Sequence, residues 1–303
     1  MKLPGLFKSS PDERQLLVID YSSTESRLAY FHDDDGELIF GAASRGPDIA
    51  TAYQSLAIKP AQFTDCVLGV PYLSLTDNST VVRYRRPKPQ DKITEDEVTG
   101  AFAQAAAGNE EDPFFEDLFS AKVDGLTTLD PVGRPGEIVE LNFYQTFARP
   151  DHLKQLIQLT HPLPVKPGVV PTAYAIAKLV TQGSAKGALV LDADDHRTEA
   201  ILVADSHLVG IKSFDVGATS LDLYTVALES ALEDMDYDDL WPEKIFISGN
   251  SQHHEALRSK LIAYPWTKNF NMLSFPEISL FHPLSVNLTQ PADVGLNALS
   301  LLV

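Results

Sequence analysis

The sequence predicts an α/β fold of two duplicated lobes with a small α+β insert between them. One pattern occurs twice: an apolar run that ends in aspartate, a polar turn, and two further strands. The first copy begins at residues 16–20 and the second at residues 188–192. The segment between the copies follows a different pattern, which indicates a separate module. A chain of 303 residues is long enough for two lobes that each bury a core.

The first copy opens with a strand at residues 16–20, which ends at Asp20 and is followed by a polar turn at 21–25. The acidic stretch 33–36 is typical of a hairpin turn. The remaining elements predicted for this lobe are strands at 27–31 and 37–42, an amphipathic helix at 49–57, and a strand at 65–70.

The second copy opens with a strand at residues 188–192, which ends at Asp192. A duplicated unit is the favoured explanation, and chance similarity between two hairpins is the alternative. After it, apolar residues at helical spacing predict a helix at 220–233. The other predicted elements are strands at 198–204, 208–214 and 244–249, and helices at 254–262 and 292–302.

The insert is predicted to contain one helix and several strands. Thr94 and Glu97 have the spacing of a capping box, in which each side chain binds the backbone amide of the other residue at a helix start. Phe143 and Tyr144 are neighbours on a predicted strand, so they should face opposite sides. The other elements are strands at 81–85 and 137–147, a hairpin at 120–129, and a helix at 153–159. The predicted domains are the first lobe at 1–80, the α+β insert at 81–150, helices that return to the first lobe at 151–183, and the second lobe at 184–303.

Charge and cysteine content exclude several classes of function. The net charge is −18, which disfavours nucleic acid and direct membrane binding. Cys66 is the single cysteine, so no internal disulfide forms, and its apolar neighbours predict a buried core residue. We find neither a signal peptide nor a membrane span in the sequence, and therefore expect a cytoplasmic protein.

Four short motifs follow the predicted strands in order. They are 20–24 (Asp-Tyr-Ser-Ser-Thr), 192–195 (Asp-Ala-Asp-Asp), 216–219 (Val-Gly-Ala-Thr) and 248–250 (Ser-Gly-Asn). Together with insert segments 93–96, 123–125, 130–133 and 136–140, and with Gly-Leu-Phe-Lys at 5–8, the order resembles the actin-like ATPase superfamily in its FtsA/PilM branch. The resemblance implies two actin-like (RNase H-like) lobes. It also implies a nucleotide site at Asp20, Ser22, Ser23, Asp192, Asp194, Gly217 and Gly249.

The phosphate loops depart from that pattern. Such loops use glycine where backbone amides approach phosphate oxygens closely. Ser22 stands at the first expected glycine, and Asp194 and Asp195 stand in the second loop. With Asp192 they would place three carboxylates near a triphosphate, at about 4 kcal/mol for each close pair of like charges at ~4 Å. We therefore expect a degenerate site without a cofactor, while Mg-ATP binding, weak or with hydrolysis, stays open.

Three further groups of residues are candidate sites. Arg83, Arg85 and Arg86 form the core of a basic cluster, which either neutralises the acidic loop of the insert or binds an acidic partner segment. The turn at 194–196 (Asp-Asp-His) is predicted to lie on the surface rather than to form an acid–base pair. The adjacent His253 and His254 point in different directions on a helix, so they are predicted as surface residues and not as metal ligands.

The resemblance also implies a function. FtsA/PilM-like proteins are cytoplasmic adaptors, recruited to the inner face of the membrane by protein partners of the divisome or of a type IV pilus. The sequence therefore predicts a scaffold that binds such partners and associates with itself head to tail, without ATP hydrolysis. An ATP-binding adaptor that polymerises is the alternative, and a structural part of a secretion or pilus platform is a third hypothesis.

Overall fold

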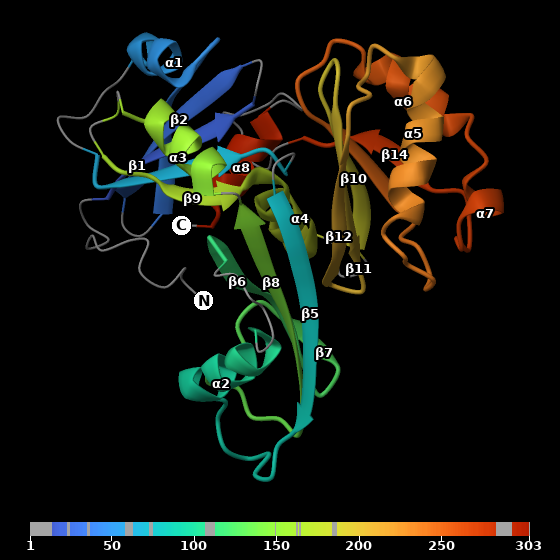
Figure 1. The fold of residues 1–303 in the computed structure, drawn as a ribbon. Helices are drawn as coiled ribbons and strands as arrows, with labels where there is room; N and C mark the ends of the chain where they lie inside the picture. Colours follow the sequence, from blue (N-terminus) through green and yellow to red (C-terminus); the bar gives the residue numbers. More distant parts are fainter. Residues whose placement is uncertain are drawn as a thin grey trace.

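Two α/β lobes lie side by side, and a smaller module extends below them (Figure 1). The computed structural model describes residues 14–22, 25–34, 37–57, 63–72, 75–106, 113–148, 150–161, 163, 165–183, 187–282 and 293–302. None of the helices in these ranges is long and apolar enough to cross a membrane. The predicted α/β class with two lobes and an insert is confirmed.

The first lobe is built on a five-stranded sheet with the order β3-β2-β1-β4-β9. Residues 16–19 of its central strand β1 are apolar and fully buried on both faces, because helices pack on the sheet. The last helix of the chain returns to this lobe and packs against β1 and α4. The elements are β1 (Gln15–Tyr21), β2 (Ser26–Asp34), β3 (Glu37–Gly46), α1 (Ile49–Ser55), β4 (Asp65–Val70), α3 (Pro150–Leu159), β9 (Gly168–Pro171), α4 (Thr172–Gly183) and α8 (Val294–Ser300).

The second lobe repeats this plan, with the order β12-β11-β10-β13-β14. In each lobe the central strand pairs antiparallel with the next strand and parallel with a later one, so Asp20 and Asp192 occupy equivalent places. This equivalence confirms the predicted duplication. The elements are β10 (Gly187–Ala193), β11 (Thr198–Ala204), β12 (His207–Phe214), α5 (Leu221–Glu233), β13 (Lys244–Ser248), α6 (His254–Ile262), α7 (Trp266–Asn269) and β14 (Glu277–Leu280).

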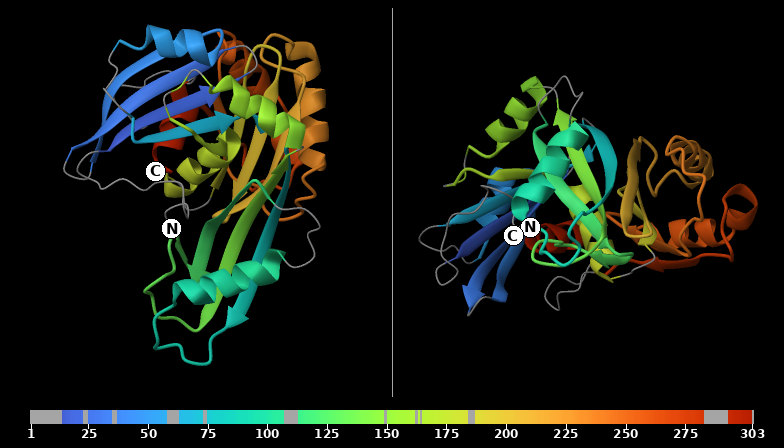
Figure 2. Two further views of the ribbon diagram at one scale, coloured as in Figure 1. Left: turned by 60° about the vertical axis from the view of Figure 1, so that its left-hand side comes forward. Right: turned by 90° about the horizontal axis from the view of Figure 1, so that it is seen from below.

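The insert forms its own sheet, with the order β5-β8-β6-β7, and helix α2 covers one face (Figure 2). Phe143 packs under α2, whereas Tyr144 joins the core of the first lobe, so the predicted opposite orientation is confirmed. The first strand of this sheet begins at Leu75, before the predicted strand 81–85. The elements are β5 (Leu75–Arg85), α2 (Glu95–Ala106), β6 (Phe115–Val123), β7 (Leu126–Thr128) and β8 (Ile138–Ala148).

Only half of the predicted capping box forms at the start of α2. Thr94 Oγ1 accepts a hydrogen bond from the Glu97 amide at 3.2 Å, as predicted. The Glu97 carboxylate instead accepts from Arg86 Nε at 2.7 Å, because the buried Arg86 guanidinium offers a stronger, charged donor. The helix therefore begins where expected but is tied to β5 by an ion pair.

Cys66 is buried on β4, as predicted from its apolar neighbours. Burial, with a smaller contribution from the Asp65 carboxylate, raises the pKa of its thiol to about 12. The thiol therefore stays protonated and acts as a small apolar core residue.

Candidate functional site: a cleft between the lobes

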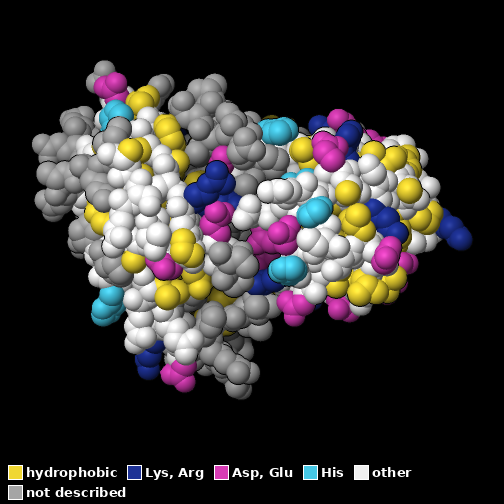
Figure 3. Space-filling model, turned by 90° about the horizontal axis from the view of Figure 1, so that it is seen from above, with side chains coloured by type: hydrophobic (Ala, Val, Ile, Leu, Met, Phe, Trp, Pro, Cys, Tyr) yellow, Lys and Arg dark blue, Asp and Glu magenta, His cyan; other side chains and the backbone are white. Residues whose placement is uncertain are grey.

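A cleft of about 480 Å³ lies between the two lobes, at the ends of the central strands β1 and β10. Viewed from above, charged and histidine side chains gather in the hollow between the lobes (Figure 3). Carboxylates outnumber cationic groups in its lining. The charged and titratable lining residues are Asp20, Glu25, Asp192, Asp194, Asp195, Glu199, Arg27, Arg45, Arg197 and His196.

The two equivalent aspartates are each held by a hydroxyl group. Thr172 Oγ1, at the start of α4, donates to Asp20 Oδ1 at 3.1 Å. Ser248 Oγ, at the end of β13, donates to Asp192 Oδ1 at 2.7 Å. The strands β1 and β10 both end at the cleft, because each lobe has the carboxyl ends of its central strands on that side. Open α/β sheets bind ligands at this edge.

The first loop of the predicted nucleotide site closes on itself. The Ser22 amide donates to the Glu25 carbonyl oxygen at 2.9 Å, and Ser22 Oγ donates to the same oxygen. The Glu25 amide donates to Ser22 Oγ at 3.1 Å. These two amides therefore have partners within the loop, and neither is left to bind a phosphate oxygen.

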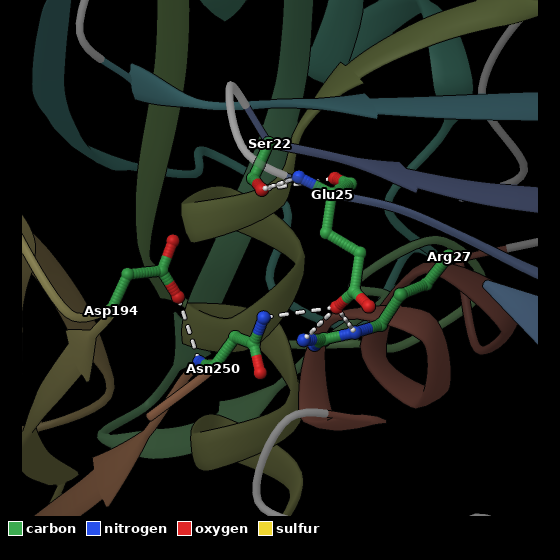
Figure 4. Close-up of polar contacts among 5 residues, drawn as sticks. All are labelled: Ser22, Glu25, Arg27, Asp194 and Asn250. Carbon is green, nitrogen blue, oxygen red and sulfur yellow. Dashed lines mark hydrogen bonds and ion pairs between the residues drawn. The ribbon is translucent and has the colours of Figure 1, made fainter. Parts of the chain in front are cut away.

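Glu25 joins the two lobes through its carboxylate (Figure 4). Its Oε2 atom accepts hydrogen bonds from Arg27 Nε at 2.9 Å and Nη2 at 2.7 Å. The same atom accepts from Asn250 Nδ2 of the second lobe at 2.9 Å. A carboxylate of the chain thus occupies the place where an arginine and an amide could otherwise hold an anion.

The second loop is cross-linked in the same way. Asp194 Oδ1 accepts a hydrogen bond from the backbone amide of Asn250 at 2.7 Å. Asp195 Oδ1 accepts one from Ser251 Oγ at 2.6 Å. On the other side of the loop, the Asp194 carbonyl accepts from the Ala218 amide at 2.9 Å. The loop is therefore fixed to both predicted glycine motifs by its own polar groups.

Gly217 packs against the backbone of this loop. A Cβ atom at this position would lie 2.3 Å from the Asp194 carbonyl oxygen and 2.4 Å from the amide nitrogens of His196 and Arg197. Gly249 has φ of +100° and also leaves no space for a Cβ atom beside Ala193. Glycine at both positions lets backbone segments pack closely, which accounts for them without a nucleotide.

Gly217→Ala is expected to lower the free energy of unfolding by about 1–3 kcal/mol, because backbone atoms must move to admit the methyl group. Urea denaturation measures the change. Gly100→Ala is the matched control, since Gly100 lies in α2 and a methyl group there would meet no neighbour within 4 Å. This control should raise stability by up to about 1 kcal/mol. Equal stability of Gly217→Ala and the unmodified protein would contradict the close packing.

Burial changes the titration of the cleft. It raises the pKa of Asp192 to about 8, with a further rise from the Asp194 and Glu199 carboxylates. Burial likewise raises the pKa of Glu199 to about 7 against the opposing charge of Arg197. For Asp20, burial outweighs the opposing charge of Arg27 and raises the pKa to about 6. The floor of the cleft therefore takes up protons near neutral pH.

Most of the residues predicted for a nucleotide site come together here. Asp20, Ser22, Asp192, Asp194 and Gly249 line the cleft, and Gly217 supports its second loop. Ser23 lies outside the described residues. The sequence reasoning gave no role to four charged residues that pair beside the cleft: Glu25, Arg27, Arg197 and Glu199. It placed Asn250 in a motif but did not predict its hydrogen bond to Glu25. The pairing of Arg27 with Asp20, and of Glu199 with Asp192, on adjacent strands was the available signal.

Of the two surface predictions, one is refined and one is wrong. The turn at 194–196 lines the cleft, with His196 exposed and both aspartates half-buried, because the turn ends a central strand. His254 is buried, and its Nε2 donates to the Ala193 carbonyl oxygen at 2.9 Å. The first turn of α6 packs under the second loop, so His254 supports the cleft from behind.

The three arginines of the basic cluster differ in their surroundings. Arg86 is buried and binds Glu97, the Asp91 carbonyl and the Gly136 carbonyl, so it holds the insert together. Arg85 is exposed and forms an ion pair with Glu137. Arg83 is exposed at the same end of β5. Two of the three side chains are therefore accessible to a partner.

Comparison with solved structures gives the fold a precedent. A chain of the PilM–PilN type IV pilus biogenesis complex is 14% identical, with a TM-score of 0.58 over 94% of this chain and 97% of that one. This likeness and the duplicated lobes confirm the predicted actin-like fold. A Bacteroides thetaiotaomicron protein with an actin-like ATPase fold and unknown function is 8% identical, with a TM-score of 0.48 over 97% and 99% of the chains. AlfA, from a filament of a B. subtilis plasmid protein, is 10% identical, with a TM-score of 0.35 over 95% and 98%. No protein-family model matches the chain, and no curated protein matches it in sequence.

Proposed function

We propose that this protein is an actin-fold adaptor that binds protein partners of a membrane-associated assembly and does not hydrolyse ATP. The observation that supports the proposal is that carboxylates of the chain itself bind the hydrogen-bond donors of the cleft. Glu25 and Asp194 accept the hydrogen bonds of Arg27 and of Asn250 that would otherwise be open to an anionic ligand. The cleft then ties the lobes together without a nucleotide.

Electrostatics favours the same conclusion. A triphosphate in the cleft would displace Glu25 and Asp194 from their donors and lie near Asp20 and Asp192. At an effective dielectric constant of 20, each pair of like charges about 4 Å apart costs about 4 kcal/mol. Protonation of Asp192 reduces the repulsion, but it leaves the donors of the two loops occupied.

The adaptor role rests on the likeness to PilM, which was solved in complex with PilN. In this proposal the protein is cytoplasmic and is recruited to the membrane by its partners, as part of a type IV pilus or a divisome. An adaptor needs a fixed shape more than a moving cleft. The hydrogen bond between Asn250 and Glu25, and that between the Tyr72 amide and Glu199 at 2.7 Å, hold the lobes in one arrangement.

Millimolar Mg-ATP is expected to raise the melting temperature by less than about 1 °C. A ligand present at 100 times its Kd would add about 2.7 kcal/mol of stability, which corresponds to a rise of a few degrees. Differential scanning fluorimetry measures the shift. Mg²⁺ alone is the control, because it separates cation binding by the carboxylates from nucleotide binding. A rise of several degrees with Mg-ATP beyond that control would support the polymerising ATP-binding adaptor instead.

The choice of assembly is tested with PilN itself. Co-elution of the protein with purified PilN in size-exclusion chromatography is expected for a pilus adaptor. Separate elution would contradict the assignment to a pilus. Asn250→Ala should not change this result, because the cleft contact lies between the lobes and is proposed to have a structural role only.

A further inference from the structure

The strand β5 has an open edge at the end of the insert far from the lobes. It is the outermost strand of the insert sheet and pairs with β8 alone among the strands of the described residues (Figure 2). Its upper part is covered, because Ser79 Oγ donates to the Leu208 carbonyl of β12 at 2.8 Å. The lower part, residues 81–85, extends beyond this contact.

The register shows which backbone groups of β5 point to the open side. The Arg86 amide donates to the Glu137 carbonyl at 2.8 Å, so residue 86 belongs to a hydrogen-bonded pair. Bonded and non-bonded pairs alternate in antiparallel strands. Tyr84 and Val82 therefore bond to β8, whereas the backbone amides and carbonyls of Val81, Arg83 and Arg85 point away from it.

The side chains of the same three residues form one exposed face, since strand residues alternate in direction. Val81 is 50% exposed, and Ile138, paired with Arg85, is 39% exposed. A shallow groove of about 380 Å³ is lined by Arg83, Tyr84, Arg85, Glu137 and Ile138. The edge thus combines free backbone groups, apolar contact area and two guanidinium groups.

The charges on this edge decide what it can pair with. Arg83 forms no ion pair within the described residues, and Arg85 has only the exposed Glu137. In an antiparallel pairing of two copies about this segment, arginine would lie opposite arginine, which is destabilising. An acidic strand would instead place a carboxylate opposite each arginine.

We propose that residues 81–85 of β5 bind an extended acidic segment of a partner protein as an added strand. Backbone hydrogen bonds along the open edge supply affinity, and Arg83 and Arg85 select acidic side chains. This inference extends the adaptor role proposed above by giving the chemistry of one partner. Its test involves neither nucleotide nor PilN, so the two proposals fail separately.

The test uses two fluorescein-labelled peptides of about eight residues, the length of a strand. One alternates Glu with Thr and the other alternates Lys with Thr. Fluorescence anisotropy is expected to show binding of the Glu peptide at least about tenfold tighter than of the Lys peptide. In Arg83→Glu/Arg85→Glu the preference should reverse.

Two controls separate strand addition from charge alone. Lys244→Glu/Lys268→Glu changes the net charge equally in exposed residues of the second lobe, and it should keep the preference for the Glu peptide. Val81→Pro removes an amide that points to the open side and leaves both arginines in place, so it should keep the melting temperature and weaken Glu-peptide binding at least about tenfold. Equal binding of the two peptides to the unmodified protein, or unchanged binding by Val81→Pro, would overturn the proposal.

Discussion

Asp117→Ala is expected to lower the free energy of unfolding by about 3–5 kcal/mol, because it leaves a buried ammonium group without its counter-charge. Asp117 lies on β6 of the insert, and Lys178 lies on α4 of the first lobe. Both are nearly inaccessible, and Lys178 Nζ lies 3.4 Å from Asp117 Oδ2. The pair therefore connects two modules in a region that excludes water.

The surroundings of Lys178 make this loss severe. Its ammonium group also donates to the Leu118 carbonyl and lies 5.6 Å from the centre of the Phe119 ring. Burial lowers the pKa of Lys178, and Asp117 opposes that shift. Without Asp117 the lysine must lose its proton or draw water into the junction, and the Tyr174 hydroxyl loses its acceptor as well.

Urea denaturation of three variants tests this expectation. Glu116→Ala is the matched control, since Glu116 is the exposed neighbour of Asp117 on β6, and it should change stability by less than about 0.5 kcal/mol. The double variant Asp117→Leu/Lys178→Met removes both charges, so its free energy of unfolding should fall less than that of Asp117→Ala. A double variant less stable than Asp117→Ala would show that packing, not the unpaired charge, dominates at this junction.

Local patterns predicted the elements of the fold well. The strands β1 and β10 were recognisable because each is a short apolar run that ends in aspartate, and α6 was predicted with its observed bounds. The missed elements β9 and α7 have four residues each and lack any periodicity. The twelve-residue helix α4 was predicted only as part of a helical segment at 151–183, without bounds. Short strands are fixed by their neighbours in the sheet, which a local pattern does not contain.

The site was less predictable because its contacts join distant segments. The resemblance placed Asp20, Asp192 and Asp194 at one site, but the hydrogen bond between Glu25 and Asn250 spans 225 residues of sequence. A sequence pattern shows that glycine is missing from a loop. It does not show that a carboxylate of the chain accepts hydrogen bonds from the remaining donors, because that contact depends on how the two lobes approach each other.

The protein is expected to lose stability as the pH rises from about 4 to about 8. Burial raises the pKa of Asp192 from 3.8 to about 8, of Glu199 from 4.5 to about 7, and of Asp20 from 3.8 to about 6. A group with a raised pKa holds its proton more tightly in the folded state. Its contribution is complete below the unfolded pKa and is lost as the pH rises through the folded pKa.

His207 acts in the opposite direction and limits the effect at acidic pH. Burial and the nearby Lys122 lower its pKa from 6.5, so its contribution is present above that pH and is lost as the pH falls. The net decline should therefore be clearest between about pH 6.5 and about pH 8, where Asp192 and Glu199 still release protons. Melting curves across this range measure it.

Asp192→Asn assigns this pH dependence to the cleft. Asparagine keeps an oxygen that can accept from Ser248 Oγ and carries no charge at any pH. The variant should match the unmodified protein at about pH 4 and exceed its stability by about 3–5 kcal/mol at about pH 8, because each pH unit between the unfolded and folded pKa is worth about 1.36 kcal/mol. Asp239→Asn, at an exposed position of the second lobe, should preserve the decline. If Asp192→Asn declined with pH as steeply as the unmodified protein, Asp192 would not be a source of the decline, and Glu199 and Asp20 would have to account for it.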